Sequence, residues 1–425
     1  MSLTDLSRSD LEAALEQAHA DYEAFAGRGL ALDITRGKPS AEQLDLAADM
    51  LTNVTADDCL SPSGVDVRNY GGLEGLIELR EIFGQLLKVP ASQLLAQGNS
   101  SLTLMHQALS FACLFGTSAG TTPWAQQPRR ILCPVPGYDR HFDLAEALGF
   151  ELVSVEMDDE GPVLEQAEEL VATDPTIKGM WLVPMYSNPT GITISNERAR
   201  RLVSMKTAAE DFKLLWDNAY ALHHLRQPHA EVIDILSLAA EAGNPDRVWI
   251  FASTSKVTHA GAGVAFFGAS DADVSWFTGH LAAASIGPDK VNQLRHLRFF
   301  GDADGVVDHM VKHAEILRPK FEAVSRILGQ RLGDDDIATW TDPNGGYFVT
   351  VSVMPGTADR VVKLAAEAGV KLTPAGSTHP YKLDPDNAVI RVAPSMPTLE
   401  DVETAVEGFA VCVRLAACEK LLAED

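Results

Sequence analysis

Residues 212–220 read Phe-Lys-Leu-Leu-Trp-Asp-Asn-Ala-Tyr, a short run rich in large apolar side chains that ends at an acid and an amide. A run of this length, bounded by polar residues, is typical of a strand buried on both faces of a sheet. Five similar runs alternate with helical stretches between about residues 95 and 270: 131–135, 151–155, 180–183, 248–251 and 264–267. The alternation predicts crossover units, and therefore an α/β fold with a mainly parallel, doubly covered central sheet.

The flanking segments predict a second, smaller unit. Apolar residues at helical spacing predict an amphipathic helix over about residues 5–27. Residues 346–353 and 388–392 have strand character, whereas 358–368 and 399–415 have helical character. Within the larger unit, Ser195 or Asn196 can cap a helix that continues through Ala209. We therefore expect a large domain over residues 50–305 and a small α+β domain built from residues 1–49 and 306–425.

Composition excludes several classes of function. The 425 residues carry 34 basic and 59 acidic groups, a formal net charge of -25, so the field of the protein repels nucleic acid and anionic membranes. No apolar run reaches the roughly 18 to 20 residues that a membrane span needs. The five cysteines are scattered without a metal-ligand spacing or a disulfide framework, which predicts a reducing, cytoplasmic setting and no structural metal.

Chemically unusual residues follow three of the predicted strands. They are Asp217 to Tyr220 after one run, residues 184–191 after a second, and Ala252 to Lys256 after a third. Because parallel strands place their carboxyl ends at one edge, an acid, an amide and a lysine converge there. A desolvated lysine has a lowered pKa and can form an imine with an aldehyde. An aspartate such as Asp217 can keep a pyridine nitrogen protonated, so that the ring accepts electrons.

These segments resemble fold-type I aminotransferases of class I, the family that contains aspartate aminotransferase. Residues 187–191 (Ser-Asn-Pro-Thr-Gly), 217–220 (Asp-Asn-Ala-Tyr) and 253–256 (Ser-Thr-Ser-Lys) are similar to its S/N-N-P-T-G, D-x-A-Y and S-x-S-K motifs. Residues 69–75, residues 134–138 and Arg391 match further family positions, in the family order and across most of the chain.

The resemblance implies pyridoxal 5'-phosphate as cofactor and a role for each matching residue. Lys256 would hold the cofactor as a Schiff base and move the substrate proton, and Asp217 would pair with the pyridinium nitrogen. Asn188 and Tyr220 would bind the ring 3′-oxygen, and Tyr138 would stack on the ring or could be a core residue. Arg391 would bind the substrate α-carboxylate through a bidentate fork.

The phosphate group needs its own donors. Residues 98–101, including Ser100 and Ser101, precede a helical stretch (102–113), so their amides and hydroxyls can cradle a dianion; they could equally be only a helix cap. Ser253 would add a hydroxyl. By the resemblance, Tyr70 would reach the phosphate of a neighbouring subunit, which implies a homodimer with shared active sites. The family's phosphate-binding arginine after S-x-S-K is missing from residues 259–265, so another cation or neutral donors alone must replace it.

For other polar residues, both a functional and a purely structural interpretation are open. Arg36, Gly37 and Lys38 lie in a segment similar to the family's substrate loop and could meet a distal carboxylate, or they could form a solvated turn. Lys290, Arg295 and Arg298 could bind a distal carboxylate or the phosphate, or form a solvated face. His223 and His224 have no partners at ligand spacing, so we expect no metal.

The sequence thus predicts a homodimeric aminotransferase that moves the amino group of an amino acid, with aspartate favoured, to 2-oxoglutarate in a ping-pong cycle. The alternatives on the same scaffold are an aromatic or alanine aminotransferase and a β-lyase. A cofactor-sensing transcriptional regulator would need a basic DNA-binding segment in front, and the acidic chain begins almost directly with the aminotransferase-like region.

Overall fold

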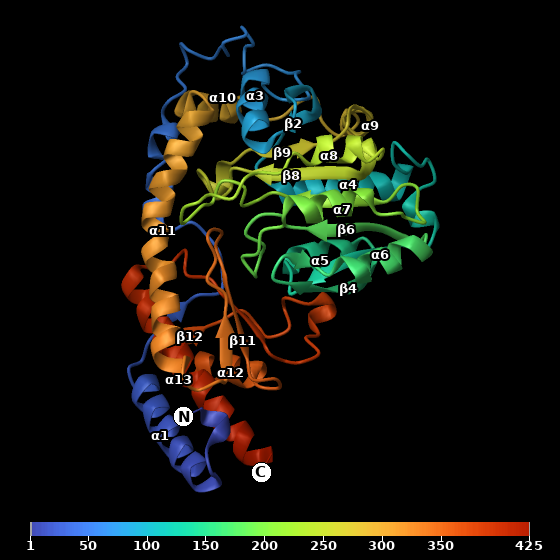
Figure 1. Ribbon diagram of the computed structural model, residues 1–425. Helices are drawn as coiled ribbons and strands as arrows, with labels where there is room; N and C mark the ends of the chain where they lie inside the picture. The colour runs from blue at the N-terminus through green and yellow to red at the C-terminus, as the bar shows by residue number, and fades with distance from the viewer. Residues whose placement is uncertain (1, 425) are drawn as a thin grey trace.

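A twisted eight-stranded sheet forms the centre of the computed structural model, which describes residues 2–424 (Figure 1). In spatial order its strands are β2 (Leu94–Ala96), β9 (Ala265–Gly268), β8 (Val248–Ser253), β7 (Lys213–Asp217), β6 (Ile177–Leu182), β3 (Arg130–Val135), β4 (Glu151–Asp158) and β5 (Gly161–Pro162). The strands from β8 to β4 pair in parallel, whereas β9 runs antiparallel to both of its neighbours. The predicted mainly parallel α/β sheet is therefore confirmed.

Helices cover both faces of this sheet, because the strand side chains alternate between two apolar layers. Leu215 of β7 packs toward the layer formed with α4 (Ser101–Phe115), α5 (Asp139–Ala147) and α9 (Asp271–Leu281). Leu214 and Trp216 of the same strand face the opposite layer. That layer contains α3 (Ile77–Leu87), α6 (Leu164–Thr173), α7 (Asn196–Ser204), α8 (Ile235–Glu241) and α10 (Lys290–Phe300).

The α7 helix begins as predicted and ends earlier than predicted. Ser195 caps it by accepting a hydrogen bond from the Arg198 amide. The expected continuation through Ala209 is wrong, because Met205 turns to an extended conformation (φ -51°, ψ 135°). Met205 and Ala209 are nevertheless buried, so the apolar pattern reflects core packing outside a helix.

The remaining elements form an α+β unit below the large sheet (Figure 1). A three-stranded antiparallel sheet orders β10 (Ala338–Trp340), β11 (Val349–Val353) and β13 (Val389–Val392), and β1 (Leu32–Asp33) pairs in parallel with β12 (Val370–Lys371). Its helices are α1 (Arg8–Ala26), α2 (Ala41–Asp45), α12 (Ala358–Glu367) and α13 (Leu399–Glu424). Short 3-10 helices are η1 (Leu3–Asp5), η2 (Ala48–Leu51), η3 (Ala91–Gln93), η4 (Trp124–Gln126), η5 (Pro245–Arg247), η6 (Ala260–Ala262) and η7 (Pro380–Lys382).

One long helix, α11 (Ala303–Leu332), runs beside both units (Figure 1). This helix was not predicted from the sequence. The predicted α1, α12 and β13 match closely, whereas α13 extends beyond residue 415 and β11 begins only at Val349. A turn with Gly346 at φ +85° precedes β11 and delays its start. The division at residues 49/50 and 305/306 stays a prediction.

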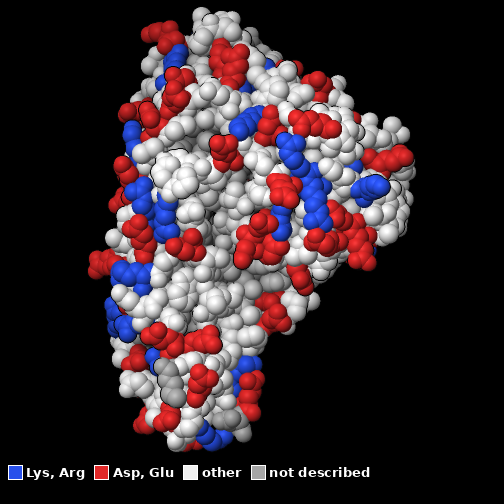
Figure 2. Space-filling model, viewed as in Figure 1, with Lys and Arg blue, Asp and Glu red and all other residues white. Residues whose placement is uncertain are grey.

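The rest of the surface adds little chemistry of its own. Acidic and basic side chains alternate over the face seen in Figure 2. Between residues 2 and 424, no helix has both the length and the apolarity needed to cross a membrane. Within the same range no cluster of three potential metal ligands occurs, and all five cysteines are free thiols.

Candidate active site

A pocket lies at the carboxyl ends of β6, β7 and β8, where the sequence placed the convergent polar residues. Its lining brings together most of the predicted site: Ser101, Tyr138, Asn188, Asp217, Tyr220 and Lys256, with Leu102, Met105, Val183 and Ala219. Strands of a parallel sheet end at one edge, so side chains that are far apart in sequence meet here.

Lys256 follows β8 and projects into this pocket. Its Nζ lies 4.8 Å from the centroid of the Tyr220 ring. Burial lowers the pKa of the lysine, and the negative charge of Asp217 partly opposes that shift. Burial also raises the pKa of Tyr220 well above its ordinary value, so its hydroxyl remains a hydrogen-bond donor at neutral pH.

Asp217, the last residue of β7, uses only one of its two carboxylate oxygens. Oδ2 accepts a hydrogen bond from His141 Nε2 at 2.9 Å. Oδ1 is buried and has no partner among residues 2–424. The His141 ring is stacked on Trp181, with centroids 4.2 Å apart and planes 8° apart. His141 was not predicted, although its place in the first turn of the helix after β3 puts it at the same sheet edge.

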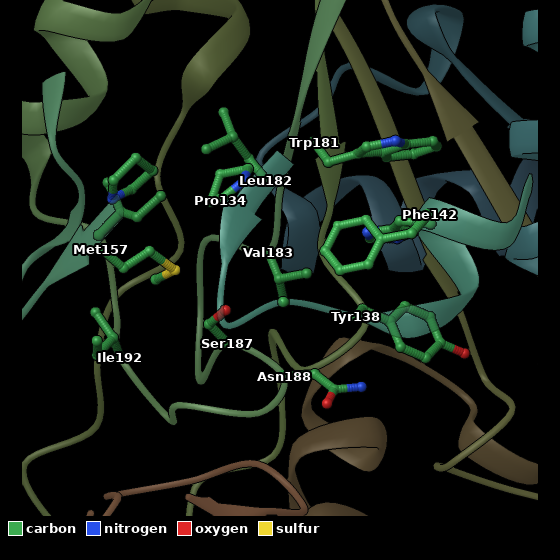
Figure 3. Close-up of a pocket in the computed structure, with 14 residues that line it drawn as sticks. Pro134, Tyr138, Phe142, Met157, Trp181, Leu182, Val183, Ser187, Asn188 and Ile192 are labelled. Atoms are coloured by element: carbon green, nitrogen blue, oxygen red, sulfur yellow. The ribbon is translucent and has the colours of Figure 1, made fainter. Parts of the chain in front are cut away.

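Tyr138 and Asn188 close the pocket from two loops. Both also line a neighbouring pocket with Met157, Trp181 and Ile192, and Figure 3 shows them there beside each other below Val183. Tyr138 occupies the N-cap position of α5, and burial raises its pKa to about 12. Asn188 is 2% exposed, and its Oδ1 accepts a hydrogen bond from Arg391 at 3.3 Å. The Nδ2 group of Asn188 is thereby left to face the pocket.

Arg391 reaches the pocket from β13 of the smaller unit. Its Nη1 donates to Asp139 Oδ1 at 3.1 Å as well as to Asn188. Its Nε is buried without a partner within residues 2–424, and its guanidinium lies 5.0 Å above the Phe348 ring. A buried guanidinium with a free N–H group can donate a charge-assisted hydrogen bond to a carboxylate.

Gly37 and Arg391 both contact the Phe348 ring. A Cβ atom on Gly37 would come within 2.4 Å of the Phe348 ring, so the ring leaves room only for glycine. Arg36 is exposed, and its side chain makes no ion pair with another residue of the described chain. Neither Gly37 nor Arg36 lines the pocket, and Gly37 is connected to Arg391 only through the Phe348 ring.

Neutral donors gather at the start of α4. Ser100 caps this helix by accepting from the Thr103 amide, and Ser101 lines the pocket. Ser253 Oγ donates to Ser255 Oγ at 3.0 Å. Ser253 does not line the pocket itself, and Tyr70 is 84% exposed and outside the pocket of its own chain.

Two of the three basic residues on α10, Lys290 and Arg298, have other partners, whereas the Nε of Arg295 is buried without a partner among residues 2–424. Lys290 is buried, and its Nζ donates to the backbone carbonyls of Asn69 and Gly71. Arg298 donates to the carbonyls of Asn53 and Asp58 and pairs with the Asp58 carboxylate at 2.6 Å. Both cations hold the chain between residues 53 and 71, so neither forms a solvated face or points at the pocket.

Comparison with known proteins agrees with this geometry. The family described as aspartate amino-transferase matches residues 6–425. An aspartate aminotransferase from Corynebacterium glutamicum is 49% identical, covering 99% of this chain and 97% of that protein. The crystal structure of an aspartate transaminase from that species is 48% identical over 99% of both chains, with a TM-score of 0.97. An alpha-aminoadipate aminotransferase from Thermus thermophilus shares the fold at 21% identity, with a TM-score of 0.72 over 96% of this chain and 98% of that one. The chain therefore belongs to the aspartate amino-transferase family and is a fold-type I aminotransferase.

Proposed function

We propose that this aminotransferase uses pyridoxal 5'-phosphate to transfer the amino group of aspartate to 2-oxoglutarate in a ping-pong cycle. Its substrates are an amino acid and a 2-oxo acid, as in its family. The names of the Corynebacterium relatives support aspartate as donor. A cytoplasmic location stays a prediction.

The unpartnered Oδ1 of Asp217 carries the proposal. A buried carboxylate oxygen without a donor is costly, and a protonated pyridine nitrogen would supply the missing hydrogen bond. His141 holds the other oxygen and thereby fixes the direction of the carboxylate. When bound, the cofactor supplies a ring that withdraws electrons from the substrate Cα.

The other pocket residues have complementary tasks. Lys256 would bind the cofactor aldehyde through its amine and then carry the proton to and from Cα. The free Nδ2 of Asn188 and the hydroxyl of Tyr220 would donate to the ring 3′-oxygen. Tyr138 would cover one ring face, and its burial, together with the negative charges of Asp217 and Asp139, raises its pKa and keeps its hydroxyl protonated.

The phosphate would lie at the start of α4, where the helix presents free amides and a positive dipole end. Ser100, Ser101 and Ser253 would supply hydroxyl donors, and Tyr70 of a second subunit would complete the site in a homodimer. The high exposure of Tyr70 within one chain is consistent with that arrangement. Lys290 and Arg298 are engaged elsewhere, which leaves Arg295 as a candidate cation in place of the family's arginine, or neutral donors alone.

Arg391 would bind the substrate α-carboxylate, using the N–H groups that Asp139 and Asn188 leave free. Gly37 would form the neighbouring wall of the substrate site, because it packs on the same Phe348 ring as the guanidinium. Arg36 stays a candidate for the distal carboxylate, from the loop position next to Gly37.

The test is the visible absorption of the cofactor-loaded protein during half-reactions. Aspartate should bleach the band of the lysine-bound cofactor, and 2-oxoglutarate should restore it, since the two cofactor forms differ in conjugation. Alanine and phenylalanine serve as matched donors without a distal carboxylate, and a faster reaction with either would contradict the choice of aspartate. Release of pyruvate and ammonia without an oxo acid would instead identify a β-lyase.

A further inference from the structure

A buried polar network lies directly behind Lys256 and is separate from the pocket. Its five side chains come from α2, the loop after β7, α11 and the loop before β11, and none is more than 4% exposed: Gln43, His223, His309, His313 and Tyr347. Burying five polar groups side by side is unfavourable unless they are hydrogen-bonded, so the partners of each group are informative.

Gln43 is the hub of this network, and its orientation follows from its partners. Its Oε1 accepts from the Ser40 amide at 3.1 Å in a capping box. Its Nε2 therefore faces His313 Nδ1 and Tyr347 Oη, each at 2.9 Å. An amide nitrogen only donates, so both of these atoms act as acceptors.

This orientation directs the remaining hydrogens toward one peptide segment. The hydroxyl hydrogen of Tyr347 is free to donate to the Lys256 carbonyl oxygen, 3.3 Å away, which also lies 3.3 Å from His223 Nε2. His313 must carry its proton on Nε2 because its Nδ1 accepts.

The two histidines of α11 lie beside the next peptide, and only one of the two short contacts of His309 Nε2 can be a hydrogen bond while both rings are neutral. Nε2 of His313 lies 3.0 Å from Nε2 of His309, and the latter is 2.7 Å from the Val257 carbonyl oxygen. Burial lowers the pKa of both rings, that of His313 to about 4, so both are neutral near pH 7.

The branch through Gln43 and Tyr347 thus ends on the Lys256 carbonyl, and His309 lies against the Val257 carbonyl that follows it. Hydrogen bonds to the Lys256 carbonyl hold the planar peptide group that follows Lys256. The orientation of that group helps to set the direction in which the Lys256 side chain leaves the backbone. We propose that Gln43 and Tyr347 are positioning residues for the reactive lysine, holding its amine in place over the Tyr220 ring. This inference rests on the proposed role of Lys256.

Tyr347→Phe tests the proposal with the smallest change, because it removes only the hydroxyl. In single turnover of the cofactor-loaded protein with aspartate, the limiting rate should fall about threefold to tenfold, the effect of one buried hydrogen bond. The apparent dissociation constant for aspartate should not change, since Arg391 and its neighbours are untouched. Absorption should also develop more slowly when the cofactor-free variant is mixed with pyridoxal phosphate.

Tyr22→Phe is the matched control. It removes a tyrosine hydroxyl that donates to a backbone carbonyl, Leu364, at 3.1 Å, far from the pocket in the smaller unit. It should leave both rates unchanged. Gln43→Met should act like Tyr347→Phe, and the double variant should be no slower than Gln43→Met alone, because both changes interrupt one chain of hydrogen bonds.

Unchanged rates in Tyr347→Phe would overturn the proposal. A loss of aspartate affinity by the same factor as the loss of rate would also overturn it, because it would indicate a general distortion of the site. Absence of an absorption band in the unmodified protein would instead refute the proposed function itself. The two failures are therefore distinguishable.

Discussion

The two ends of β7 each carry a buried charge, and their surroundings differ. Lys213, at the start of the strand, has its Nζ bonded to Asp273 Oδ2 at 2.7 Å and to the Asp246 carbonyl, and it lies 5.2 Å from the Trp249 ring centroid. Asp217, at the end of the strand, has one oxygen on His141 and the other without a partner within residues 2–424. The Lys213 ammonium therefore has a carboxylate and a carbonyl as hydrogen-bond partners. The Asp217 carboxylate has a partner on only one of its two oxygens.

Further examples of each kind lie near the two ends of β7. At the amino-terminal edge, Asp211 accepts from Lys178 Nζ at 3.0 Å and from Trp124 Nε1 at 2.6 Å. At the carboxyl-terminal edge, buried atoms of Asn218 and Arg391 lack partners in the described chain. Compensated clusters contribute to folding, whereas uncompensated polar atoms retain hydrogen-bonding capacity for a ligand. Replacing one residue at each edge separates these two roles.

The largest expected effect is that of Asp217→Asn. The amide preserves the shape of the side chain but cannot stabilise a protonated ring nitrogen, so turnover should fall by about 10²- to 10⁴-fold. Melting temperature measured on the cofactor-free protein should change little. Turnover close to that of the unmodified protein would show that the open oxygen of Asp217 has no part in the chemistry.

Asp273→Asn is the counterpart at the other end of β7. It leaves the buried ammonium of Lys213 without its negative partner, and the free energy of unfolding should fall by about 3 kcal/mol. Denaturant unfolding measures this loss, and turnover per folded molecule should be unchanged. A large loss of turnover in the folded fraction would contradict the separation of the two edges.

The smallest effect is expected for Asp139→Asn. Asp139 neutralises Arg391 across 252 residues of sequence and must compete with a substrate carboxylate for the same guanidinium. Its replacement should lower the KM for aspartate about threefold to fivefold, with kcat unchanged, because one charge-assisted contact no longer competes. An increase in KM would show instead that Asp139 helps to orient Arg391 for binding.

The strands of the central sheet were predictable because a buried strand has a local apolar pattern. The polar residues at their ends were predictable as site residues because ligands bind beyond the carboxyl ends of parallel strands. The α11 helix was missed although its buried residues Val306, Met310, Leu317, Phe321 and Val324 recur at helical spacing. That spacing is the signal that could have identified it.

The partners of the site residues were not predictable from local pattern. His141 contacts Asp217, and Arg391 contacts Asp139, only after distant segments have packed together. In the sequence, Gln43 resembles any polar residue of a short capped helix. Only the folded structure shows that it is buried and that it contacts Tyr347. The same applies to Gly37, whose need for glycine depends on the Phe348 ring.

Chemical trapping can show directly which lysine bears the cofactor. Borohydride reduction of the protein loaded with pyridoxal phosphate converts an imine into a stable amine, and peptide mass mapping then locates the modified residue. The expected result is one modification, on the peptide that contains Lys256, and its loss in Lys256→Ala. Modification of a different lysine, or none in protein that has been supplied with the cofactor, would contradict the account.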